Sequence, residues 1–272
     1  MSITDVRSHR PLVHCITNYV TVNDCANALL AIGAAPVMAD DYAEVADITQ
    51  LSGALVLNIG TLNARTIRSM LRSGRAARTK GIPVILDPVG AGASALRTRT
   101  AQKIIKIVKP SVIRGNLSEI GALLSGNAKT RGVDAAAEDT GSDATRRAEE
   151  AGRQLARHTG AIVAITGKTD VVSDGNRIIR IHNGHSLMPT VTGTGCMATA
   201  ITAAFCSAAQ AEGKPLIDAV ALALALTGLA GERAALRLPH GGSASFRTAF
   251  IDELSLIDDR ILEREGRLDT AS

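Results

Sequence analysis

The stretch VTGTGC, which ends at Cys196, places two glycines and a cysteine directly before a run with helical periodicity. Gly193, Thr194 and Gly195 can turn their backbone N–H groups inward at the start of this helix, where the helix dipole favours anions. The stretch lacks the Walker A pattern GxxxxGK[ST], and Ala198 breaks the dinucleotide pattern GxGxxG. The sequence therefore predicts an anion hole at these three residues, with Cys196 beside it.

Cys196 is the sharpest candidate for chemistry. A helix N-terminus favours the thiolate form of a cysteine, so the residue could serve as a general base or as a covalent nucleophile. Phosphoryl transfer needs little base strength, because positioning dominates it. Covalent catalysis would need a histidine partner, for which His14 and His185 are candidates. The alternative without chemistry is a small, buried apolar side chain.

Polar residues end several apolar runs that predict buried strands, at residues 12–16, 54–59, 83–87, 111–113 and 161–166. Ligands of open parallel sheets bind at the carboxyl ends of the strands. Asp87 at one such end suits Mg²⁺ held through water, although it could instead brace the turn at Pro88. Arg114 can fork onto phosphate oxygens, and its alternative is a surface ion pair.

Three further residues stay open on the sequence alone. Glu119 lies three residues after Asn116, which is the spacing of a capping box, so capping and metal binding are both possible roles. Met38 follows an apolar run at 35–38, where methionine is usually part of the core. Thr166 ends its strand and is equally compatible with a ligand site and an ordinary turn.

Strands alternate with helices along most of the chain, which predicts an α/β fold with a mostly parallel sheet covered on both faces. Thr21 and Asp24 have capping-box spacing, and Thr61 is expected to start the next helix. The glycines at 33, 81 and 160 are expected to end helices. Asp174-Gly175 predicts a hairpin within 171–181 and an antiparallel edge. The polar segment 126–143 is expected to be a long loop, and the C-terminal third to be helical.

The totals exclude several classes of protein. The 272 residues show no linker or repeat, so one domain covering 1–272 is expected. The net charge of +4 forms no block and aromatics are 2%, which argues against nucleic-acid binding. No signal peptide is recognisable, and the apolar run 219–231 is judged too short to span a bilayer. Four cysteines without a CxxC pair indicate reduced thiols in the cytoplasm.

With these residues in place, the sequence resembles the hydroxyethylthiazole kinases of the ribokinase-like superfamily. The resemblance runs from about residue 11 to residue 205, in the family's order, and its segments are NYVTVNDCANALLAIGAAPVMA, GALVLNIGTLN, PVILDPVGAGA, IRGNLSEI, AITGKTDVVSDG and VTGTGC. A cysteine at position 196 is typical of the thiazole kinases, whereas most relatives in the superfamily carry aspartate. Leu117 departs slightly, since a smaller residue is expected there.

The resemblance implies a three-layer ribokinase-like fold and transfer of the γ-phosphate of ATP, with Mg²⁺, to the primary alcohol of 4-methyl-5-(2-hydroxyethyl)thiazole in thiamine salvage. It implies a homotrimer with sites between subunits. The residue roles that it implies are Cys196 as general base, Met38 and Gly193 for the thiazole, Arg114 and Thr166 for the ATP phosphates, and Asp87 and Glu119 for Mg²⁺, mostly through water. The alternatives are a kinase of the same fold for hydroxymethylpyrimidine or pyridoxal, and a hydrolase or acyltransferase with a cysteine nucleophile.

Overall fold

The computed structural model describes residues 1–125, 142–238 and 240–271, so most of the predicted 126–143 loop lies outside the described residues. Nine strands form one sheet in the order β2-β1-β3-β4-β5-β6-β7-β8-β9. The strands are β1 Leu12–Ile16, β2 Ala35–Val37, β3 Ala54–Asn58, β4 Val84–Asp87, β5 Val112–Asn116, β6 Ile162–Thr166, β7 Asp170–Ser173, β8 Ile178–Ile181 and β9 Leu268–Ala271. From β2 to β6 all neighbours are parallel, and β7 to β9 add an antiparallel edge.

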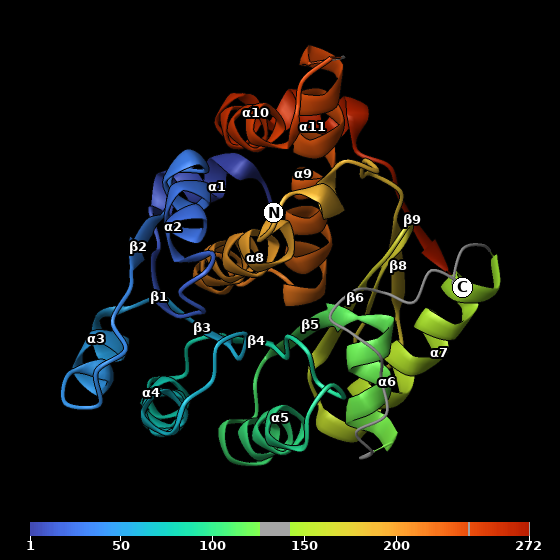
Figure 1. The fold of residues 1–272 in the computed structure, drawn as a ribbon. Coiled ribbons are helices and arrows are strands. Elements are labelled where there is room, and N and C mark those ends of the chain that lie inside the picture. Colours follow the sequence, from blue (N-terminus) through green and yellow to red (C-terminus); the bar gives the residue numbers. More distant parts are fainter. Residues whose placement is uncertain (126–141, 239, 272) are drawn as a thin grey trace.

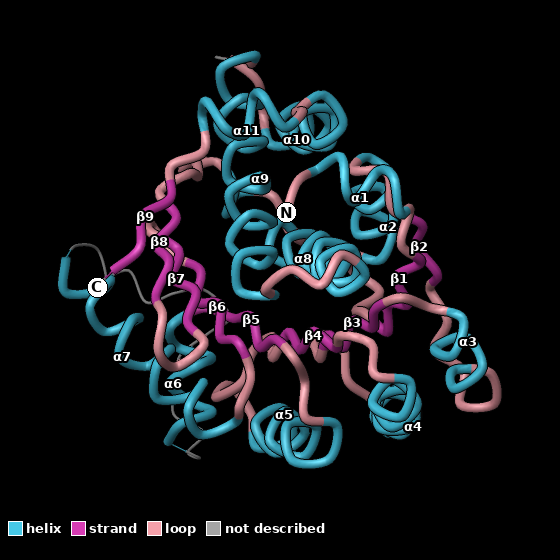
Figure 2. Tube along the Cα trace, turned by 180° about the vertical axis from the view of Figure 1, so that it is seen from behind, coloured by secondary structure: helices cyan, strands magenta, loops and turns pink. Residues whose placement is uncertain are grey.

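Helices cover both faces of this sheet, as the sequence predicts (Figure 1). The described helices are α1 Ile3–His9, α2 Val22–Ala31, α3 Val45–Leu51, α4 Ala64–Lys80, α5 Ala95–Val108, α6 Leu117–Ser125, α7 Ser142–Thr159, α8 Thr194–Ala211, α9 Leu216–Arg237, α10 Ser243–Leu256 and α11 Asp259–Glu265, with a short 3₁₀ turn η1 at Met188–Thr190. The helices α3 to α7 lie on one face. The other face carries α1, α2, α8 and α9, with α10 and α11 packed outside them (Figure 2).

The alternation of side chains along the strands divides the core in two. Val56 of β3 packs into the cluster on the side of α8, whereas its neighbours Leu55 and Leu57 pack into the cluster on the opposite side. Both faces of a central parallel strand are therefore apolar, which is why these strands read as continuous hydrophobic runs. On the two neighbouring strands β3 and β4, the only polar side chains are Asn58 and Asp87, at the carboxyl ends.

Helix α2 begins after Thr21 as predicted, but the capping box predicted there is wrong, and so is the predicted start of the helix that becomes α4. Thr21 makes no side-chain cap on α2, because its hydroxyl donates to Asn18 Oδ1 at 3.1 Å. Helix α4 begins after Asn63, not at Thr61, and Asn63 forms a capping box with Thr66. The helix-ending glycines at 33, 81 and 160 are confirmed by their positive φ angles of 87°, 79° and 73°.

The strand predictions need two corrections, one at the end of β5 and one for a strand that the sequence did not predict. β5 extends to Asn116, so Arg114 lies within the strand, paired with Ala164 of β6, rather than after it. β9 was not predicted: four residues near the C-terminus pair antiparallel with β8, because that strand offers an open edge. The predicted hairpin of β7 and β8 is confirmed, with Gly175 at φ 95° in its turn.

The apolar helix α9 corrects another expectation. It is 22 residues long and is the one helix in the described part of the chain that has the length and composition to cross a membrane. The sequence suggested that the apolar run 219–231 is too short to span a bilayer, but the helix that contains this run is long enough. However, 72% of its most apolar window is buried, and it packs between α8 and α10. The burial identifies α9 as a core helix.

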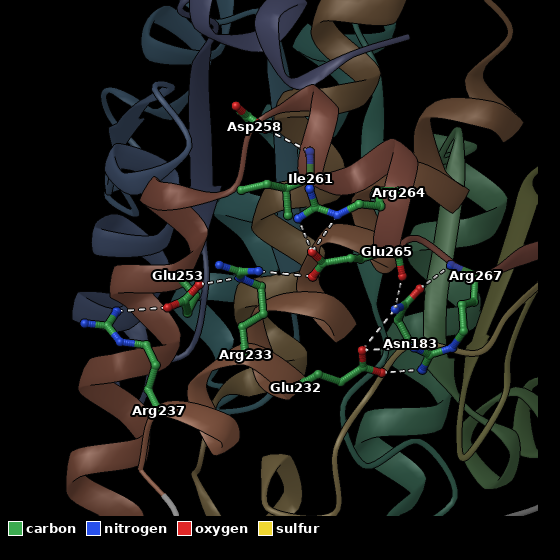
Figure 3. Close-up of polar contacts among 10 residues, drawn as sticks. All are labelled: Asn183, Glu232, Arg233, Arg237, Glu253, Asp258, Ile261, Arg264, Glu265 and Arg267. Carbon is green, nitrogen blue, oxygen red and sulfur yellow. Dashed lines mark hydrogen bonds and ion pairs between the residues drawn. The ribbon is translucent and has the colours of Figure 1, made fainter.

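Ion pairs fasten the outer helices to α9 (Figure 3). The buried carboxylate of Glu253 on α10 accepts from Arg233 Nε at 2.8 Å and from Arg237 Nη1 at 2.9 Å. Arg233 also donates to Glu265 of α11 at 3.1 Å. Two arginines give this buried charge the pairing without which it would be strongly destabilising. Beside them, Asn183 donates to Glu232 of α9 at 3.2 Å.

Candidate active site

Three neighbouring strands deliver polar side chains to one point at the start of α8. Asn18 follows β1, Asn58 ends β3 and Asp87 ends β4, and their strands are adjacent in the sheet. Asn58 Nδ2 donates to Asp87 Oδ2 at 2.9 Å and to Cys196 Sγ at 3.2 Å. Asn18 Nδ2 donates to Cys196 Sγ at 3.3 Å. The Asn58 amide thus joins the predicted carboxylate to the predicted thiol, and the Asn18 amide is a second donor to the thiol.

The two glycines at the start of α8 are packed closely against neighbouring side chains. Gly193 is the N-cap with φ 93°, and a Cβ there would lie 2.7 Å from Thr21 Cγ2. A Cβ on Gly195 would lie 2.7 Å from Arg114 Nη1. No side chain caps α8. The first N–H groups of a helix have no partner within it, so the N–H groups here remain available to an anion.

Asp87 is only 1% exposed, and burial raises its pKa from 3.8 to about 7, against the opposing effect of the Arg114 guanidinium. Its Oδ2 accepts from Asn58 and, at 2.8 Å, from Thr199 Oγ1. Its Oδ1 is buried without a hydrogen-bond partner among the described residues. A ligand or cation site needs a carboxylate oxygen that is not already hydrogen-bonded. A carboxylate that only stabilised the turn at Pro88 would not need to leave a buried oxygen without a partner.

Glu119 forms the capping box that its spacing allows. Its Oε2 accepts from the backbone N–H of Asn116 at 2.9 Å, while Asn116 Oδ1 accepts from the N–H of Glu119 at 2.8 Å. Its Oε1 accepts from the N–H of Gly90 at 2.8 Å, in the loop after β4. Burial raises the pKa of Glu119, and its negative charge in turn raises the pKa of Asp87. The capping role is therefore confirmed, and the carboxylate also lies near Asp87.

Arg114 and Thr166 meet across the β5–β6 pair. Arg114 Nη2 donates to Thr166 Oγ1 at 2.9 Å, and Arg114 Nε is buried without a hydrogen-bond partner in the described part of the chain. None of the ion pairs found between described residues includes Arg114. The alternative of a surface ion pair is thus wrong. The guanidinium instead lies beside Gly195 at the N-terminal end of α8.

The expectation of a favoured thiolate at Cys196 is wrong for the ligand-free protein. Burial raises the pKa of this thiol, and the negative charge of Asp87 raises it further. Side-chain hydrogen bonds from Thr21, Asn18 and Asn58 lower this pKa in part. Burial and a nearby carboxylate therefore outweigh the position of the thiol at a helix N-terminus.

Neither candidate histidine partners the thiol. His14 is buried, with Nδ1 at 2.9 Å from Thr49 Oγ1 and Nε2 at 2.8 Å from the carbonyl of Ala39. His185 Nδ1 accepts from the N–H of Leu187 at 3.2 Å. The hydrogen bonds found for the described residues include none between a histidine and Cys196. A covalent thiol mechanism therefore lacks the base that it needs.

Met38 lies just after β2, partly buried, and packs against the same apolar cluster as Cys196. The sequence assigned no role to three other residues of this centre, Asn18, Asn58 and Thr199. Two of them were visible as amides at strand ends. Thr199 lies about one helical turn after Cys196 on α8, and nothing in the sequence alone connects it to Asp87.

The fold defines the class of the protein: it is that of the ribokinase-like proteins. A ribokinase-like superfamily protein from Enterococcus faecalis V583 superposes with a TM-score of 0.63 at 12% identity, covering 94% of this chain and 89% of that one. A pyridoxal kinase from Staphylococcus aureus in complex with pyridoxal gives a TM-score of 0.58 at 16% identity over 96% of this chain and 97% of that chain. At such identities the likeness concerns the fold alone.

The chain belongs to the hydroxyethylthiazole kinase family, which residues 3–260 match. A hydroxyethylthiazole kinase from Ruminiclostridium cellulolyticum is 51% identical over 98% of this chain and 95% of its own length. The structure of a hydroxyethylthiazole kinase protein from Pyrococcus horikoshii OT3 has a TM-score of 0.88 at 38% identity, over 99% of this chain and 97% of that one. The predicted fold and family are thereby confirmed.

Proposed function

We propose that this protein transfers the γ-phosphate of ATP to the primary alcohol of 4-methyl-5-(2-hydroxyethyl)thiazole, a salvage step of thiamine biosynthesis. The observation that carries the proposal is the hydrogen-bonded set of Asp87, Asn58 and Cys196 at the glycine-rich start of α8, beside the Arg114 guanidinium. Its membership of the hydroxyethylthiazole kinase family supports the substrate.

In this mechanism Arg114 and Thr166 hold the ATP phosphates, and the N–H groups of residues 194–196 receive the negative charge that develops during transfer. Cys196 orients the alcohol and, in its thiolate form, accepts the proton that the alcohol loses; because the pKa of this thiol is raised, the thiolate forms at higher pH than that of an ordinary cysteine. A bond forms between the alcohol oxygen and the γ-phosphorus, and the bond from that phosphorus to the departing ADP oxygen breaks. The unpaired Nε of Arg114 supports a phosphate role, because a phosphate oxygen would satisfy it.

Mg²⁺ is the metal that this site fits. When bound, it would neutralise charge on the phosphates. Asp87 would hold it through water with Oδ1, the oxygen that has no protein partner. Glu119 would assist through water, since both of its oxygens already accept backbone hydrogen bonds. No group of three or more metal-binding side chains occurs in the described part of the chain, which suits an ion held largely by water and substrate.

Met38 and Gly193 are the residues that we place against the thiazole ring. Met38 and Cys196 both pack, partly buried, against the apolar cluster on the α8 side of the sheet, which supports a place for the ring on that side. We further propose a cytoplasmic homotrimer with sites between subunits, acting on small molecules and not on nucleic acid or membranes. The exposed apolar side chains of Tyr19 and Val20, directly after Asn18, support an interface next to the site.

The first test is ATP- and Mg²⁺-dependent phosphorylation of the thiazole alcohol by purified protein, with hydroxymethylpyrimidine and pyridoxal as competing substrates. We expect turnover on the thiazole and little on the other alcohols. Preferred turnover on another alcohol would keep the phosphate site and overturn the substrate. Absence of all kinase activity would overturn the proposal.

A Cys196→Asp variant tests the role of the thiol. We expect it to retain kinase activity and to reach its maximum at lower pH than the wild type, because the wild-type thiol has a raised pKa and aspartate ionises more readily. The matched Cys196→Ala variant should lose about 100-fold in kcat, as expected for loss of a proton acceptor. A Cys196→Asp variant without activity would instead point to covalent chemistry.

A further inference from the structure

Asn58 lies between the two groups that the proposed reaction uses and has itself no assigned role. It ends β3, is 2% exposed, and is in register with Asp87 of the neighbouring strand β4. Its side chain separates the carboxylate of Asp87 from the sulfur of Cys196, two groups that can both carry negative charge. The question is what this amide contributes that a carboxylate or an apolar side chain would not.

Every hydrogen-bonding position of the Asn58 side chain is used. Its Nδ2 donates to Asp87 Oδ2 at 2.9 Å and to Cys196 Sγ at 3.2 Å. Its Oδ1 accepts from Asn18 Nδ2 at 3.1 Å and from the N–H of Gly60 at 2.9 Å. A primary amide has two N–H donors and two acceptor lone pairs, so all four are satisfied.

The backbone determines which way this amide faces. The N–H of Gly60 can only donate, so the atom of Asn58 opposite it must be the oxygen. Both amide hydrogens then face Asp87 and Cys196. A rotated amide would set donor against donor at Gly60 and acceptor against acceptor at Asp87. Because the side chain is buried, such mismatches would not be relieved by water.

We propose that Asn58 is a positioning residue that holds the Asp87 carboxylate and the Cys196 sulfur at a fixed separation and presents an N–H donor to each. This inference rests on the proposed kinase function. Asn18 and Asn58 both donate to Cys196, so the sulfur is an acceptor on the side of these two amides. The same amide keeps Asp87 Oδ2 engaged, whereas Oδ1 has no hydrogen-bond partner among the described residues.

The isosteric variant Asn58→Asp tests this role, because it keeps the shape and the acceptor for Gly60 but replaces the double donor. We expect kcat to fall about 100-fold, with the KM for ATP and the KM for the alcohol within about threefold of wild type, as for an interaction that matters in the transition state. Asn58→Ser, which retains one hydroxyl donor, should recover part of this loss. Equal kcat in all three proteins would overturn the proposal.

A substrate-independent measurement separates this inference from the proposed function. Iodoacetamide modifies the thiolate of cysteine, and Cys196 is the only partly exposed cysteine, while the other three are buried. We expect its alkylation, followed by peptide mass spectrometry on the full-length protein, to slow about tenfold in Asn58→Asp, because a donor is replaced by a like charge. An unchanged alkylation rate would contradict the role of Asn58, whether or not the protein phosphorylates the thiazole.

Asn183→Asp is the matched control. Asn183 is also buried, at 4% exposed, and also donates to a carboxylate, that of Glu232, but it lies at the junction with the C-terminal helices (Figure 3). The same chemical change there should lower stability and leave the alkylation rate of Cys196 and kcat unchanged. If this control slowed alkylation as much as Asn58→Asp does, the effect would be a general consequence of a buried charge, and the proposal would fail.

Discussion

Asp87 is the residue at which function and stability oppose each other. The carboxyl group is nearly fully buried, one of its oxygens has no hydrogen-bond partner among the described residues, and its pKa is raised from 3.8 to about 7. In the ligand-free protein the folded state therefore holds this proton to higher pH than the unfolded chain does. Between about pH 4 and pH 7 the unfolded chain has already lost the proton, so this group lowers the free energy of unfolding as the pH rises.

The Asp87→Asn substitution removes the ionisable group and with it this loss of stability at higher pH. At pH 8 we expect the ligand-free variant to exceed the wild type in free energy of unfolding by up to about 4 kcal/mol, since each pKa unit corresponds to about 1.36 kcal/mol. The difference should shrink toward zero below about pH 3, where the Asp87 carboxyl group is protonated in both the folded and the unfolded wild-type chain. Urea unfolding at several pH values measures it. A difference in free energy of unfolding that does not change with pH would contradict the raised pKa of Asp87. We also expect the Asp87→Asn variant to have lost kinase activity.

At the scale of elements, the close packing of α9 depends on small residues. A Cβ on Gly228 would lie 2.4 Å from the backbone oxygen of Asn183, in the segment after β8. A backbone neighbour cannot move aside as a flexible side chain can. By contrast, Gly121 in the middle of α6 has no atom within 4 Å of its Cβ position. Packing therefore excludes a side chain at Gly228, whereas there is room for one at Gly121.

The two alanine substitutions should have effects of opposite sign. Gly228→Ala should lower the free energy of unfolding by about 1–3 kcal/mol, because it overpacks the contact between α9 and the chain after β8. Gly121→Ala should raise it by about 0.5–1 kcal/mol, because alanine loses less backbone entropy in a helix. Chemical denaturation of both variants measures the difference. Equal effects would show that helix propensity, not packing, governs position 228.

At the scale of the whole molecule, exposed apolar side chains lie beside the site. Tyr19 is 78% exposed and Val20 is 57% exposed, in the turn between Asn18 and α2, and Leu30 at the end of α2 is 59% exposed. Each is ordinary by itself on a soluble surface. Tyr19 and Val20 directly follow Asn18, which donates to Cys196, so an interface at these side chains would lie next to the site.

A Val20→Lys substitution tests the proposed trimer. We expect the wild type to have about three times the 28.2 kDa mass of the chain by light scattering, and the variant to be smaller, because a charge buried at an interface without a partner is costly. The variant should also lose kcat/KM if sites lie between subunits. Leu236→Lys, at a leucine that is 80% exposed on α9, is the control and should keep both mass and activity. A monomeric, active wild type would contradict the proposal.

Much of the fold was readable in the sequence because its signals are local. The apolar runs predicted β1 to β6, Asp174-Gly175 predicted the β7–β8 hairpin, and glycines such as Gly81 predicted helix ends. These depend on burial and on backbone conformation within a few residues. The position of Asp87 at a strand end followed in the same way. So did the glycine turn ahead of Cys196, whose place at the start of α8 is confirmed.

Contacts between distant residues were decided only by the tertiary structure. Asn18 and Asn58 lie 178 and 138 residues before Cys196, yet both donate to its sulfur, because parallel strands end side by side and α8 returns to that edge. Asp24 was predicted to cap α2, but it pairs with Arg247, 223 residues away. The raised pKa of Cys196 is likewise a tertiary effect, since desolvation depends on what packs around a group and not on its neighbours in sequence.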